Sequence, residues 1–183
     1  MSFYNYLIDY TLTDNGTITE PVTLAEAKNY SRVSTNADDS LITDLITQAR
    51  EAVEKATGLC LTSKNVVAFF NNPTGGIEMP FGPMDKTTFH LYDNNTGVEI
   101  LPATYSLVGD HYPSLRYPTW ANLKATYTSA YNPIPKDLKT AILDQIDYDY
   151  ENRGADIERY DTTGVCPKAW RACQRYTRTS PIL

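Results

Sequence analysis

The stretch EPVTLAEAKNYSRVSTNADDSLITDLITQAREAVEKATGLCL, residues 20–61, predicts two consecutive helices. Thr23 and Glu26 have the spacing of a capping box, in which each side chain bonds a free backbone N–H group of the first helical turn. This pair predicts a short helix over about residues 24–31. No side chain in the stretch has an evident catalytic partner.

The second helix is predicted to begin after the polar segment STNADDS, with Asn36 or Asp38 as its N-cap. Gly58 suits the C-terminal cap, because glycine adopts the left-handed conformation that ends many helices. Between these ends, apolar residues recur at three- and four-residue spacing. They are Leu41, Ile42, Leu45, Ile46, Ala49, Val53 and Ala56.

Residues 61–131 have a different pattern, with short segments rich in β-branched and aromatic residues between Asn-, Gly- and Pro-rich turns. The segment TTFHLYDNNTGVEI, residues 87–100, predicts a hairpin. We therefore expect a small antiparallel β unit. The proline-bracketed MPFGPM, residues 79–84, is either a rigid bend between strands or a polyproline ligand for a partner.

Helical patterns return at NPIPKDLKTAILDQIDYDYENRG, residues 132–154, and again over about 167–177. The predicted fold class is α+β, a helical bundle of about four helices with an inserted small antiparallel β unit. Residues 20–60 and 132–178 would form one discontinuous helical core, and residues 61–131 the β insertion. Residues 1–19 are expected to be an N-terminal arm, and residues 179–183 a C-terminal tail.

The composition indicates neither an enzyme nor a metalloprotein. The three cysteines and two histidines lack the spacing of a zinc site, so we expect no cofactor and no metal. No nucleophile motif or phosphate loop is present, so we expect no catalytic residue. No apolar run approaches the roughly 20 residues that cross a bilayer, and the first residues do not resemble a secretory signal. We therefore expect no membrane partner and a cytoplasmic origin.

The third predicted helix carries a row of acids, in a chain with a net charge of −6 that disfavours general affinity for nucleic acid. Three interpretations are open: a solvated helix face, a like-charged surface turned toward DNA, or an acid–base site. The row, which we call the acidic stripe, is Asp137, Asp144, Asp147 and Glu151.

The last predicted helix carries a row of bases, and residues 166–183 contain no acidic side chain. The row is either a solvated helix end, favoured by the helix dipole, or a docking element for an acidic partner protein. This basic stripe is Lys168, Arg171, Arg175 and Arg178.

Taken in order, these motifs resemble the head-to-tail connector, or adaptor, family of long-tailed bacteriophages and gene-transfer particles. The resemblance is clearest in EPVTLAEAKNYSRV and ADDSLITDLITQAREAVEKATGLCL and continues through IEMPFGPM and YSLV. It extends to LKATYTSAYNPIPKDLKTAILDQIDYDYENRG and the closing CPKAWRACQRYTR, so that it spans most of residues 18–178.

The resemblance implies a structural virion protein that forms a ring, dodecameric in typical members, around the DNA exit channel. Such a ring lies in the neck at the portal vertex, between the portal protein and a stopper or tail-terminator protein. Genomic DNA passes through the lumen without sequence-specific binding, and the particle is assembled in the host cytoplasm. The basic stripe occupies the place of the family's portal-docking segment, and the acidic stripe would then face the channel.

Two alternatives remain from the sequence. The chain could be another neck or tail-completion protein, such as a stopper. A more distant alternative is a small acid-dependent hydrolase built on Asp144, Asp147 and Glu151.

Overall fold

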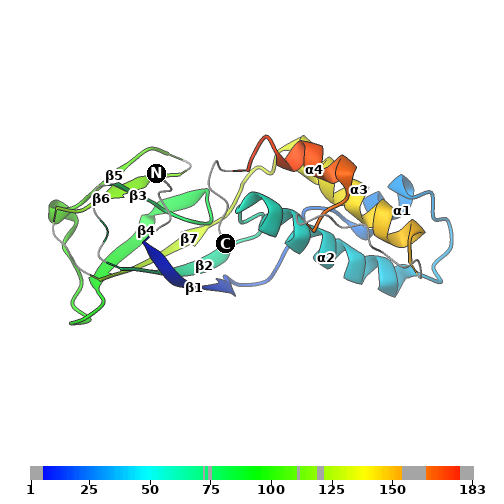
Figure 1. Cartoon of the computed structure of the whole chain (residues 1–183). Coiled ribbons are helices and arrows are strands. Elements are labelled where there is room, and N and C mark those ends of the chain that lie inside the picture. The colour runs from blue at the N-terminus through cyan, green and yellow to red at the C-terminus, as the bar shows by residue number, and fades with distance from the viewer. Residues whose placement is uncertain are drawn as a thin grey trace. The chain divides into compact units, whose positions relative to one another are not determined.

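The computed structural model describes residues 6–71, 73, 76–110, 112–118, 122–153 and 164–177. The chain divides into two compact units. Among the described residues, the β unit contains residues 6–18 and 62–131, and the helical unit contains residues 19–61 and 132–177. Figure 1 shows the elements of each unit.

The helical unit is built from helices that contact one another: α1 with α2 and α3, α2 with α3 and α4, and α3 with α4. The helices are α1 (Leu24–Tyr30), α2 (Asp39–Thr57), α3 (Lys136–Glu151) and α4 (Pro167–Cys173). Their inward faces supply the core residues Ile42, Ile46, Ala49, Val53, Leu138, Ala141, Ile142, Ile146, Ala169 and Cys173. The predicted α+β class is therefore confirmed.

The helix ends follow the predicted signals, with one exception. Thr23 and Glu26 form the complete capping box of α1, and Gly58 caps α2 in the left-handed conformation with φ 70°. Asp38 occupies the N-cap position of α2, but its side chain makes no capping bond. It instead accepts hydrogen bonds from Tyr150 and Arg153, which hold the pKa of Asp38 below its ordinary value.

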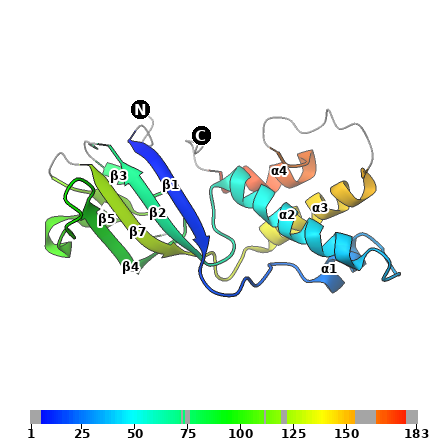
Figure 2. The same cartoon turned by 90° about the horizontal axis from the view of Figure 1, so that it is seen from below.

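The β unit contains two antiparallel sheets, which Figure 2 shows from below. The four-stranded sheet has the order β1-β2-β7-β4, and the three-stranded sheet has the order β3-β6-β5. The strands are β1 (Leu7–Asp14), β2 (Lys64–Phe70), β3 (Gly76–Glu78), β4 (Met84–Asp93), β5 (Ser106–Val108), β6 (Ser114–Arg116) and β7 (Leu123–Ser129). Alternating residues of β2 and β7 are buried, as expected for strands with one face on a core.

Residues 1–19 were expected to be an arm apart from the β insertion, and that expectation needs correction for residues 7–14. These residues form β1, which pairs with the whole of β2, from Leu7 opposite Phe70 to Asp14 opposite Lys64. The alternation in LIDYTLTD is typical of a strand, and the sequence analysis did not use it.

The predicted hairpin over residues 87–100 is present. After β4 the chain turns back, and the Asp93 N–H donates to the Val98 carbonyl at 3.0 Å. The Ile100 N–H donates to the Leu91 carbonyl at 2.7 Å. Residues 98–100 therefore lie along the outer side of β4.

The MPFGPM segment is a bend folded into the core rather than an exposed ligand. Met79, Phe81 and Met84 are buried. The Tyr127 hydroxyl donates to the Pro80 carbonyl, and the Ser129 hydroxyl donates to the carbonyls of Phe81 and Pro83. These hydrogen bonds from β7 hold the bend in place, so MPFGPM does not present an exposed polyproline surface.

Candidate functional site

The two charged stripes meet where α3 packs against α4. Asp144 of α3 is buried, with 7% of the residue exposed, and it pairs with Lys168 of α4. The hydroxyl of Tyr30, from the end of α1, donates to the same carboxylate oxygen. Lys168 in turn donates to the Tyr30 oxygen at 3.0 Å. This triad joins three helices.

The triad shifts the pKa values of Tyr30 and Lys168. Its hydrogen bond to the Asp144 carboxylate raises the pKa of Tyr30, and the bond from Lys168 opposes that change only in part. Hydrogen bonds with Asp144 and Tyr30 raise the pKa of Lys168. The lysine is therefore charged, and it forms an ion pair with Asp144 of α3.

A second contact between the stripes involves Asp137, at the first turn of α3. The Tyr176 hydroxyl donates to its Oδ1 at 2.7 Å, and Arg175 Nη1 lies 3.7 Å from its Oδ2. Arg175 has 74% of its side chain exposed, so this pair adds little stability.

Two predicted site residues therefore need correction. Asp144 cannot be part of a free acidic surface, because it is buried and bound to Lys168. Lys168 is not an unneutralised cation for the same reason. The sequence analysis treated each stripe separately, whereas the packing of α4 on α3 pairs them.

The remaining stripe residues are more accessible. Arg171 and Glu151 are exposed and Asp147 is half-buried. Among the described residues, none of these three forms an ion pair. Arg178 lies outside the described residues.

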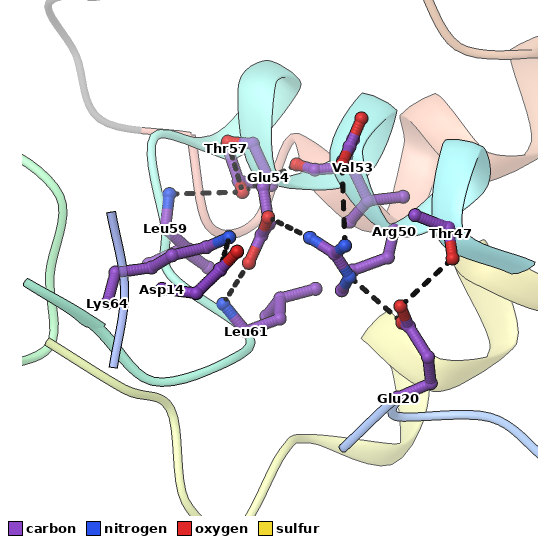
Figure 3. A network of polar contacts seen from close by, with 11 residues as sticks. Asp14, Glu20, Thr47, Arg50, Val53, Glu54, Thr57, Leu59, Leu61 and Lys64 are labelled. Atoms are coloured by element: carbon purple, nitrogen blue, oxygen red, sulfur yellow. Dashed lines mark hydrogen bonds and ion pairs between the residues drawn. The ribbon is translucent and has the colours of Figure 1, made fainter. Parts of the chain in front are cut away.

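The sequence analysis missed the most buried charge of the helical unit, which is Arg50 on α2. Only 1% of its side chain is exposed. Its guanidinium contacts Glu20 at 2.9 Å and Glu54 at 2.7 Å (Figure 3). It also lies 3.4 Å from the Glu51 carboxylate. Burial disfavours its charge, but the hydrogen bond to Glu20 and the charges of Glu54 and Glu20 prevail and raise the pKa of Arg50.

The Arg50 cluster, which consists of Arg50, Glu20, Glu51 and Glu54, connects α2 to the segment before α1 and to the segment after α2. Glu20 precedes α1, and it also accepts from the Thr47 hydroxyl at 3.1 Å. Glu54 accepts from the Leu61 N–H at 2.7 Å, just beyond the end of α2. Arg50 therefore ties both segments to α2. In the sequence, the signal for a buried Arg50 was its position four residues after Ile46, which places it on the apolar face of the predicted helix.

The part of the chain that the structure describes contains no group of three or more His, Cys, Asp or Glu residues that could hold a metal ion. Cys60, Cys166 and Cys173 are buried, and none of these three cysteines is in a disulfide bond. Across the same residues, no helix has both the length and the apolar character of a membrane span.

Comparison with known proteins connects this arrangement to a class of structural proteins. Residues 21–91 match the family model of the Phage gp6-like head-tail connector protein. The match contains α1, α2, β2, β3 and most of β4. The predicted resemblance to head-to-tail connectors is thereby confirmed over these residues. No curated protein matches the chain in sequence.

Solved structures with the same fold come from gene transfer agent (GTA) particles. A chain from the neck of an empty GTA particle, computed with C6 symmetry, has a TM-score of 0.65 at 20% identity. A chain from the virion of a native GTA particle has a TM-score of 0.63 at 21% identity. A third, from the neck of a native GTA particle computed with C12 symmetry, has a TM-score of 0.62 at 17% identity. Each alignment covers 94% of this chain and 97% of the other.

The family model describes a connector, and the structural neighbours are parts of a particle neck or virion. The solved structures, at 17–21% identity, show that the fold is shared. The buried, paired Asp144 also removes one of the three acids on which the hydrolase alternative depended.

Proposed function

We propose that this chain forms a closed ring in the neck of a virion or virion-like particle, between the portal protein and a stopper or tail-terminator protein. The observation that carries the proposal is the match of residues 21–91 to the head-tail connector model. The likeness of the fold to neck chains solved with C6 and C12 symmetry, over 94% of this chain, supports the ring.

In this proposal, the exposed end of α4 contacts the portal. Arg171 is exposed, and it forms no ion pair with another described residue. Lys168 and Arg175 have 68% and 74% of their side chains exposed, so both can still contact a partner while paired with α3. The three cations would select an acidic portal surface and fix the register of docking, with Arg178 extending the row.

The acidic members of α3 that remain accessible are the candidates for the channel surface. Glu151 is exposed and Asp147 is half-buried. Carboxylates that line a lumen repel the phosphate backbone, so that DNA can pass without binding. This role is therefore proposed for Asp147 and Glu151 of the acidic stripe. Asp137 is less available, because its carboxylate accepts a hydrogen bond from the Tyr176 hydroxyl.

The direct test is to mix the purified full-length chain with purified portal rings and to measure the stoichiometry of the complex by native mass spectrometry. We expect one closed ring of the chain on each portal ring. Arg171→Glu should weaken binding by about tenfold, because it reverses the charge of an unpaired docking cation. Lys55→Glu, an exposed cation on α2, is the matched control and should leave binding unchanged.

A chain that never joins portal rings would contradict the neck role. Equal binding by wild type and Arg171→Glu at moderate salt would instead remove α4 from the docking surface, and the solvated interpretation of the basic stripe would stand.

A further inference from the structure

The three-stranded sheet buries one face and leaves the other accessible. Ile77 of β3 and Leu115 of β6 lie directly opposite each other, and both are buried. Because successive side chains of a strand point to opposite faces, the residues next to them lie on the other face of the sheet. On that outer face, Gly76, Arg116 and Ser106 lie directly opposite one another on β3, β6 and β5. The outer face therefore carries an arginine between two positions that have little or no side chain.

A cavity of about 750 Å³ opens on this outer face. Its lining includes four residues of the outer face, which are Gly76, Ser106, Ser114 and Arg116. The other lining residues are 103–105, which precede β5, and 117–118, which follow β6. Cavities that hold small ligands have volumes of about 300–1,000 Å³. This cavity is therefore large enough for one or two side chains of a partner, and all of its lining residues belong to the β unit.

Gly76 keeps part of the cavity open. A β-carbon at this position would lie 2.7 Å from the Ser114 hydroxyl oxygen, which is closer than atoms in van der Waals contact. Any larger residue would therefore displace that hydroxyl group and occupy space next to it. The absence of a side chain at Gly76 leaves the Ser114 hydroxyl in place on the outer face.

Aromatic and proline rings form apolar walls of the cavity. The ring of Tyr105 packs edge-on against Phe89, a buried core residue, with the ring centroids 5.5 Å apart. Burial, followed by the charge of Glu99, raises the pKa of Tyr105, so its hydroxyl keeps its proton and can donate a hydrogen bond. Tyr117 and Pro118 supply further ring surface. The cavity therefore combines apolar walls with hydroxyl groups.

Arg116 gives the cavity a positive charge that lacks a carboxylate partner. Among the described residues that line the cavity, none is acidic. Arg116 is exposed, and it forms no ion pair with another described residue. Glu99 does not line the cavity, and its carboxylate lies 2.6 Å from the His90 ring nitrogen. In a chain with 22 acidic and 16 basic side chains, this arginine is available to a carboxylate from another molecule.

We propose that this cavity binds an aspartate or glutamate side chain of a partner protein, with the carboxylate on Arg116 and an adjoining apolar side chain against the rings of Tyr105 and Pro118. A guanidinium group binds a carboxylate through two parallel N–H donors, which makes the pair both strong and directional. The hydroxyl groups of Tyr105 and Ser114 supply further donors.

A nucleic acid fits the cavity less well than an acidic segment of protein. Affinity for a phosphate backbone grows with the number of phosphates that cations neutralise, and Arg116 is the one cation among the described residues that line the cavity. The net charge of −6 also disfavours a polyanion. The inference goes beyond the proposed ring and does not depend on it, because the cavity uses no residue of α4.

The test is a titration of the isotope-labelled full-length chain with a panel of blocked peptides, followed by amide NMR. Each peptide carries a single glutamate flanked by leucine, phenylalanine or proline, and each has a counterpart with glutamine in place of glutamate. At least one glutamate peptide should shift the amide signals of β3, β5 and β6. Its glutamine counterpart should bind about tenfold more weakly, because the pair of carboxylate and guanidinium is lost.

The variants separate the charge of the cavity from its shape. Arg116→Gln should weaken binding of the glutamate peptide by about tenfold, whereas Lys55→Gln, which removes an exposed cation from α2, should leave it unchanged. Gly76→Ala should weaken binding severalfold by displacing the Ser114 hydroxyl. Because that variant introduces a close contact, Ser114→Ala is a second variant that removes the same donor without adding an atom. Far-UV circular dichroism of Arg116→Gln should match that of the wild type, since Arg116 is exposed.

Equal binding of the glutamate and glutamine peptides, or equal binding by wild type and Arg116→Gln, would overturn the proposal. So would the absence of binding by every glutamate peptide at millimolar concentration. Inorganic phosphate and a single-stranded oligonucleotide are titrated in parallel, and tighter binding of either at the same amides would assign the cavity to phosphate instead. None of these results bears on the neck role, which the experiment with portal rings tests separately.

Discussion

Arg50 is charged, yet it lies on the apolar face of α2 with 1% of its side chain exposed. A buried arginine is tolerated when carboxylates satisfy its planar donors, and here Glu20 and Glu54 bind it at 2.9 and 2.7 Å. The arginine is therefore a structural residue whose partners come from both sides of the α1–α2 segment.

Replacing Arg50 with methionine should destabilise the helical unit by about 3 kcal/mol, because two partly buried carboxylates lose their partner. Urea unfolding followed by circular dichroism measures the change. Lys55→Met, on the exposed side of the same helix, should change the stability by no more than about 0.5 kcal/mol. Equal effects of the two substitutions would contradict the role given to Arg50.

Cys173 predicts a dependence of stability on pH. Burial, followed by the nearby Cys166, raises the pKa of Cys173 to about 12. The unfolded thiol ionises near pH 8.5, so above that pH the unfolded state binds fewer protons than the folded state. Stability therefore falls as pH rises from about 9 toward 12, by at most about 1.4 kcal/mol for each pH unit from this group.

Cys173→Ala should flatten this slope, whatever its effect on stability at neutral pH. The measurement is the unfolding free energy of wild type and variant at a series of alkaline pH values. Parallel slopes in the two proteins would show that the thiol does not ionise on unfolding.

At the scale of elements, the helices of residues 20–58 followed from local signals. The capping box of Thr23 and Glu26, the periodic apolar residues and the terminal Gly58 act within one helix and can be interpreted without tertiary structure. The pairing of Asp144 with Lys168 joins α3 to α4 across a long sequence separation, and no local pattern encodes it. β1 was missed although its alternating residues are a local strand signal, and only its pairing with β2, which lies beyond both helices, is non-local.

The attachment of α4 to α3 depends on a buried hydrogen bond that this reasoning also missed. The Gln145 side chain of α3 accepts from the Cys166 N–H, at the start of α4, at 2.6 Å. Gln145→Leu leaves that N–H buried without its partner, at a cost of about 1–3 kcal/mol. Hydrogen exchange should accelerate in α4 more than in α2. Gln48→Leu, on the exposed side of α2, is the control, and uniform acceleration in both helices would contradict a local role.

At the scale of the whole molecule, the described residues of both units expose side chains suited to contacts with partners. The β unit exposes apolar side chains, and the helical unit exposes the cations of α4. The order of the motifs along the chain carried the connector resemblance, which the match over residues 21–91 confirms for those residues. The sequence patterns could not predict which strands lie at the edges of the four-stranded sheet, because that depends on pairings between distant segments.

The measurement that tests the account most directly is a reconstruction of the neck of particles that carry this chain. The account predicts a closed ring of its copies against the portal, with the exposed face of α4 toward the portal. A neck in which the portal joins the tail without such a ring, in particles that remain infectious or able to transfer DNA, would contradict it.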